Sequence, residues 1–61
     1  MSPVININDV EIEVGTVNQT IHWIEANGSY LNPTLSVKVN TDEEILEIKK
    51  IYPNIKIIKN E

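Results

Sequence analysis

The sequence predicts an α/β (α+β-like) fold: a two-layer sandwich in the order β-β-α-β-α-β, with two helices on one face of a four-stranded mixed sheet. Three observations lead to this fold class. Residues 33–59 read as strand, helix, strand, a unit with parallel strands and a right-handed crossover. Residues 4–14 read as a β-hairpin that leads into a helix. Polar and apolar residues alternate in three strands, whereas a sheet covered on both faces has strands that are apolar throughout.

The hairpin prediction rests on its turn. Asn8-Asp9 suits a two-residue turn, because both residue types tolerate positive φ angles. The register that follows puts four β-branched residues on one face, namely Ile5, Ile7, Val10 and Ile12. The opposite face then carries Val4, Asn6, Glu11 and Glu13.

The first helix is predicted from its two ends. Thr16 and Gln19 have the spacing of a capping box, in which each side chain satisfies a backbone N–H group left free by the first turn. The helix is expected to end at about Asn27, because Gly28 suits the left-handed conformation that terminates helices. Its apolar side consists of Val17, Thr20, Ile21 and Ile24, with Trp23 on the flank. After this helix, Tyr30 and Leu31 are expected to cover the edge of the core.

The second helix is predicted in the same way. Thr41 and Glu44 form a second capping box, and Pro53 ends the helix because the residue before a proline favours extended geometry. Its apolar side consists of Ile45, Ile48 and Tyr52, with Leu46 and Ile51 on the margins. Strands are expected at 35–39 and 55–58, the second with Ile55 and Ile57 on one face and Lys56 and Ile58 on the other. The strand order stays open, although charge pairing favours a glutamate-bearing strand beside a lysine-bearing one.

Length and composition limit how the fold is stabilised. A chain of 61 residues allows one small domain over residues 1–61, and such a domain buries only about 60% of its unfolded surface. There is no cysteine, which removes both disulfides and thiolate metal sites. Self-association is then the remaining source of additional buried surface, and the alternative is an ideally packed monomer.

Charge and residue usage exclude some classes of function. The net charge is −4, and the basic residues are five lysines with no arginine, so direct nucleic-acid binding is not expected. No apolar stretch approaches the length of a membrane span, and a cytoplasmic protein without a membrane partner is expected. The abundance of isoleucine, asparagine and lysine indicates an AT-rich coding sequence, as in a low-GC bacterium or its phages.

No residue pattern indicates catalysis, a cofactor or a metal. His22 and Glu25 stand three apart on a helix, but no serine, cysteine or second carboxylate completes an acid–base site. The acidic run Asp42-Glu43-Glu44 lacks the loop spacing of a calcium site, and helix capping already explains it. The protein is therefore expected not to be an enzyme.

The favoured function is a small protein–protein interaction module that forms homo-oligomers. Trp and Tyr dominate the energetics of protein interfaces, which makes Trp23 and Tyr30 candidate contact residues. Val4 and Ile58 lie on the otherwise polar face of the sheet, and this face or the free sheet edges would carry self-contact. Such a module would be an assembly component or a modulator of a host protein.

The alternative is an acidic mimic of nucleic acid. Residues 1–37 carry four acidic and no basic residues, and this set would occupy the basic groove of a DNA- or RNA-binding protein: Asp9, Glu11, Glu13 and Glu25. A plain structural reading also exists, because charges on an outer sheet face keep it soluble and protect its edges.

The hairpin followed by a helix also resembles the opening of a β-grasp domain. That family continues with further strands, whereas this sequence continues towards a second helix. The resemblance therefore implies no function for the chain.

Overall fold

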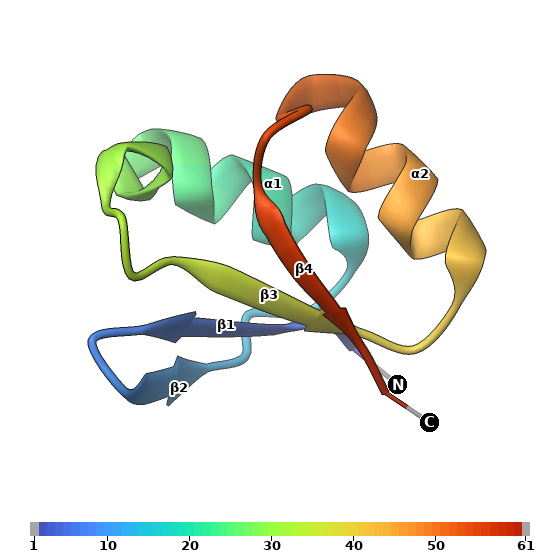
Figure 1. Ribbon diagram of the computed structural model, residues 1–61, viewed down its shortest axis with the longest axis horizontal. Helices are drawn as coiled ribbons and strands as arrows, with labels where there is room; N and C mark the ends of the chain where they lie inside the picture. Colours follow the sequence, from blue (N-terminus) through green and yellow to red (C-terminus); the bar gives the residue numbers. More distant parts are fainter. Residues whose placement is uncertain (1, 61) are drawn as a thin grey trace.

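The computed structural model describes residues 2–60 and contains the predicted elements in the predicted order (Figure 1). Their bounds are β1 Val4–Ile7, β2 Val10–Ile12, α1 Val17–Ala26, the short 3-10 helix η1 Ser29–Leu31, β3 Ser36–Val39, α2 Asp42–Ile51 and β4 Lys56–Lys59. Strands β3 and β4 each begin one residue later than expected, at Ser36 and Lys56.

The four strands form one mixed sheet in the order β2-β1-β3-β4. Strand β1 pairs antiparallel with β2 and with β3, whereas β3 and β4 run parallel. Both helices lie on the same side of this sheet (Figure 1), so the predicted two-layer sandwich is confirmed. Strands β2 and β4 are its two edges.

The hairpin has the predicted register. Ile7 pairs with Val10 and Ile5 pairs with Ile12, and the turn residues Asn8 and Asp9 both have positive φ angles, of 51° and 66°. The side chain of Asn8 also accepts a hydrogen bond of 3.0 Å from the Thr34 hydroxyl. The hairpin turn is thereby tied to the segment that leads into β3.

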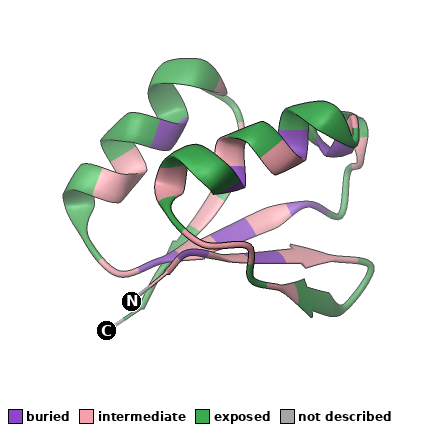
Figure 2. Ribbon diagram, turned by 180° about the vertical axis from the view of Figure 1, so that it is seen from behind, coloured by how far each residue is buried: buried purple, intermediate pink, exposed green. Residues whose placement is uncertain are grey.

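The core lies between the sheet and the two helices. Its buried apolar side chains come from β1, from β3 and the residue before it, and from both helices: Ile5, Ile24, Leu35, Val37, Val39 and Ile48. Figure 2 shows buried positions in the strands of the sheet as well as in both helices. The one buried hydroxyl of α1, on Thr20, donates to the Thr16 carbonyl at 2.9 Å, so its burial leaves no polar group unpaired.

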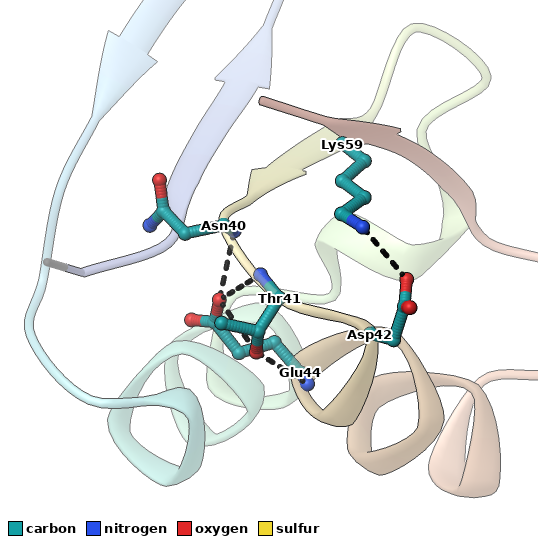
Figure 3. Close-up of polar contacts among 5 residues, drawn as sticks. All are labelled: Asn40, Thr41, Asp42, Glu44 and Lys59. Carbon is teal, nitrogen blue, oxygen red and sulfur yellow. Dashed lines mark hydrogen bonds and ion pairs between the residues drawn. The ribbon is translucent and has the colours of Figure 1, made fainter. Parts of the chain in front are cut away.

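Both capping boxes are present. In α1 the Gln19 side-chain carbonyl accepts from the Thr16 N–H at 2.8 Å. In α2 one oxygen of Glu44 accepts from the N–H groups of both Thr41 and Asn40, at 2.8 and 2.7 Å (Figure 3). The second box therefore also ties the end of β3 to the start of α2.

Two expectations are wrong. The glutamate-bearing β2 does not lie beside a lysine-bearing strand, because β1 separates it from β3; the Lys38 amine instead reaches past β1 to within 3.9 Å of the Glu11 carboxylate. Tyr30 and Leu31 do not cover the core, because η1 turns them outward and leaves them 50% and 77% exposed. Trp23, Ile7 and Ile12 are among the side chains packed against the core.

Candidate interaction surfaces

The sheet face that points away from the helices is called the outer face here. Register pairs Val4 with Lys38 and Lys38 with Ile58, so the two predicted apolar contact residues lie in one row with a lysine between them. Ile58 is 44% exposed and Val4 is half-buried. The outer face therefore carries two separate apolar points and no continuous apolar patch.

The acidic residues of the hairpin belong to the outer face and the β2 edge. Glu11 and Glu13 alternate with the inward-facing Ile12 and are exposed, as is Asp9 in the turn. Glu25 is not part of this group, because it lies on α1 in the opposite layer. The structure thus brings Asp9, Glu11 and Glu13 together and separates Glu25 from them.

Trp23 lies on α1 and is half-buried. Its ring packs against the core, which accounts for part of its surface. Ile21 and His22 line the groove between α1 and α2, and Trp23 stands about 160° around the helix from Ile21. The exposed part of Trp23 therefore lies on the flank of α1 that faces away from α2.

A pair of stacked tyrosines marks the end of the helix layer. The rings of Tyr30 and Tyr52 have centroids 5.7 Å apart and planes inclined by 16°, an offset stacking geometry favoured by aromatic pairs. Beside them is an open hollow of about 230 Å³ lined by Tyr30, Ile51, Tyr52, Pro53, Asn54 and Ile55. A second hollow, of about 200 Å³, shares Tyr30, Asn54 and Ile55 and extends towards Pro33 and Lys56.

We call Tyr30, Leu31 and Ile51 the Tyr30 patch. Tyr30 and Ile51 line the first hollow, Ile51 is 53% exposed, and Leu31 follows Tyr30 in η1. Burial raises the pKa of the Tyr52 phenol above its ordinary value of 10.0, and the nearby Glu25 carboxylate and Tyr30 ring add to this. Tyr52 is therefore neutral where it lines the hollow.

Sequence reasoning named Tyr30 but missed its partners in this patch. Helical spacing puts Ile51 on the margin of its helix and Tyr52 on the apolar side. Nothing in helical spacing connects Tyr30 with Tyr52, because they belong to different elements. The exposure of Leu31 could not be predicted either, because a 3-10 turn of three residues is too short to show periodicity in the sequence.

Among residues 2–60, no group of three or more His, Asp or Glu side chains is arranged to hold a metal ion. His22 is exposed on the groove between the helices. In the acidic run, Asp42 pairs with the Lys59 amine at 3.1 Å and Glu44 caps α2 (Figure 3). These carboxylates thus have structural partners.

No family model, curated protein or solved structure matches this chain. Within residues 2–60, none of the helices has the length and apolar character needed to cross a membrane.

Proposed function

We propose that this protein is a non-enzymatic protein–protein interaction module that associates with itself. It acts in the cytoplasm of a low-GC bacterium or its phage, as an assembly component or as a modulator of a host protein. The observation that carries the proposal is the Tyr30 patch, an apolar surface with a hollow beside it that the small core does not use.

The composition of the patch supports this reading. Exposed tyrosine and aliphatic side chains around a hollow have the character of an interface core, where one anchor side chain of the partner is desolvated. The tyrosine stack holds the rings in place before a partner arrives, so less side-chain freedom is lost on binding. The hollow of about 230 Å³ suits a single side chain of a partner better than a drug-sized ligand, whose sites start at about 300 Å³.

The first test is the solution mass of the wild-type protein, measured by light scattering behind size exclusion from micromolar to millimolar concentration. We expect species larger than the monomer that grow with concentration. Leu31→Lys and Ile51→Lys test the patch as a contact, and Glu43→Gln is the control, because it makes the same change in net charge at an exposed site at the other end of α2. A wild-type protein that stays monomeric throughout would overturn the proposed self-association.

The second candidate function is an acidic mimic that blocks a DNA- or RNA-binding protein. It is favoured by the placement of Asp9, Glu11 and Glu13 on one exposed hairpin, where only Glu11 lies near a lysine. A mimic binds its target with an affinity that falls steeply with salt. An affinity for a basic test protein that is the same at low and high salt contradicts this candidate. An affinity that the double substitution Glu11→Gln/Glu13→Gln leaves unchanged contradicts it as well.

A further inference from the structure

We propose that a second copy of this chain adds its β4 to the free edge of β2, parallel to it, so that the sheet continues from one copy to the next. In this arrangement Lys56 of the next copy lies beside Glu11, and Ile57 of the next copy lies beside Ile12. The inference rests on the proposed self-association and adds the two sheet edges to the Tyr30 patch as surfaces of self-contact.

The two edges of the sheet have opposite charges. The β2 edge carries Asp9, Glu11 and Glu13, whereas β4 begins and ends with Lys56 and Lys59. Pairing β2 with β2, or β4 with β4, would place like charges side by side, which destabilises neighbouring strands. Pairing β2 with β4 places opposite charges together. The edge charges therefore disfavour a symmetric edge-to-edge dimer and favour a head-to-tail contact.

The register of the sheet makes this contact specific. One row across the outer face runs Glu11, Asn6, Ser36, Lys56, and the adjacent row on the helix side runs Ile12, Ile5, Val37, Ile57. A copy displaced along these rows continues both of them, with a lysine beside a glutamate and an isoleucine beside an isoleucine. The strand directions agree as well, because β2, β3 and β4 all run antiparallel to β1.

The backbone groups at the two edges also match. The pairs of Ile7 with Val10 and Ile5 with Ile12 flank a two-residue turn, so they exchange hydrogen bonds inside the hairpin and Glu11 directs its N–H and C=O outward. On β4 the Asn60 N–H donates to the Val39 carbonyl at 2.7 Å, and alternation directs the backbone groups of Ile57 and Lys59 outward. With Lys56 beside Glu11, the outward N–H of Ile57 meets the outward carbonyl of Glu11, as a parallel ladder requires.

The helix layer has the same repeat length as the sheet. Four strands about 4.8 Å apart span about 19 Å, and two helices about 10 Å apart span about 20 Å. A copy that continues the sheet therefore places its α2 beside α1 without a gap or an overlap. Both layers of the sandwich then extend together.

Each of the two helix flanks that meet in this way exposes one large apolar side chain. Leu46, which is 71% exposed, lies one turn after Asp42, and Asp42 pairs with Lys59 of β4 at 3.1 Å (Figure 3). This flank of α2 therefore lies over the β4 edge. The opposite flank of the helix layer is the side of α1 that exposes Trp23. Head-to-tail assembly brings Leu46 of the next copy towards Trp23, and Val10, also exposed on β2, gains cover.

The test uses two charge reversals, each of which weakens a head-to-tail contact when it is introduced alone. Glu11→Lys puts a lysine beside Lys56 of the next copy, and Lys56→Glu puts a glutamate beside Glu11. We expect each variant alone to lose association by about tenfold, the size of effect expected when a favourable cross-strand charge pair becomes a repulsive one. An equimolar mixture of the two variants regains the wild-type mass, because every β2 edge then meets a β4 edge of opposite charge.

Glu47→Lys and Lys50→Glu are the matched controls, since both residues line the groove between α1 and α2, away from the two edges. Circular dichroism of each variant confirms that it is folded. A wild-type oligomer that neither edge reversal weakens, or a mixture that fails to regain it, overturns the head-to-tail contact and leaves the proposed self-association standing. A wild-type protein that is monomeric at millimolar concentration overturns both the head-to-tail contact and the proposed self-association. Binding of a foreign protein at the Tyr30 patch is then the part of the proposed function that remains.

Discussion

The Glu44 carboxylate offers a sharp test of how a single side chain joins two elements of this fold. One of its oxygens accepts hydrogen bonds from the Asn40 N–H at 2.7 Å, the Thr41 N–H at 2.8 Å and the Thr41 hydroxyl at 3.3 Å (Figure 3). The bond to Asn40 is part-buried, whereas those to Thr41 are exposed. Replacing Glu44 with alanine removes all three bonds.

The expected loss follows from these partners. A hydrogen bond to a charged group contributes about 1.5–3 kcal/mol, and the exposed Thr41 N–H recovers much of its share by binding water. The Asn40 N–H recovers less, so we expect Glu44→Ala to lower the free energy of unfolding by about 2 kcal/mol. A domain of 61 residues has a total stability of roughly 3–9 kcal/mol, so this is a large fraction.

The assay is urea unfolding, followed by circular dichroism and by the fluorescence of Trp23. With a slope of about 1 kcal/mol per molar urea, at the low end for small proteins, the midpoint falls by about 2 M. Glu43→Ala is the control, because Glu43 lies in the same first turn of α2 and shares the helix-dipole interaction. We expect that control to change the stability by less than about 0.5 kcal/mol. Equal effects of the two substitutions would refute the capping argument.

Three further predictions concern the core, the residue before the N-cap of α1 and the pH dependence of stability. Ile48→Ala, at a fully buried position, is expected to cost about 3 kcal/mol in urea unfolding, whereas the same change at the exposed Leu46 costs less than about 1 kcal/mol. Gly15 has a φ of +126° and a Cβ there would collide with the Gln19 side chain, so Gly15→Ala is expected to cost at least about 1 kcal/mol; an unchanged midpoint would contradict this. The pKa of Tyr52 is raised in the folded state, so its phenol proton is held more tightly there than in the unfolded chain. The resulting contribution to folding stability is complete below pH 10.0 and is lost as the pH rises through the folded pKa. Tyr52→Phe should therefore unfold with a weaker dependence on alkaline pH than the wild type, and matching curves would show that Tyr52 titrates as it does in the unfolded chain.

The local elements could be read from the sequence because their causes lie within three or four residues. The hairpin register follows from the preference of Asn8 and Asp9 for positive φ, and each helix start follows from two side chains three residues apart that each accept from the other's backbone N–H. Alternation of polar and apolar residues was likewise sufficient to predict that both helices cover one face. These features depend on backbone geometry that neighbouring residues determine.

The tertiary structure decided what depends on residues far apart in the chain. The hairpin could join the βαβ unit through either of its strands, and the observed order with β1 in the interior leaves the acidic β2 and the lysine-bearing β4 as opposite edges. The stack of Tyr30 on Tyr52, and the exposure of Leu31 beside it, arise where the turn after α1 meets the end of α2. No periodicity in the sequence encodes such meetings, because they result from how the packed layers place chain segments that are 20 or more residues apart.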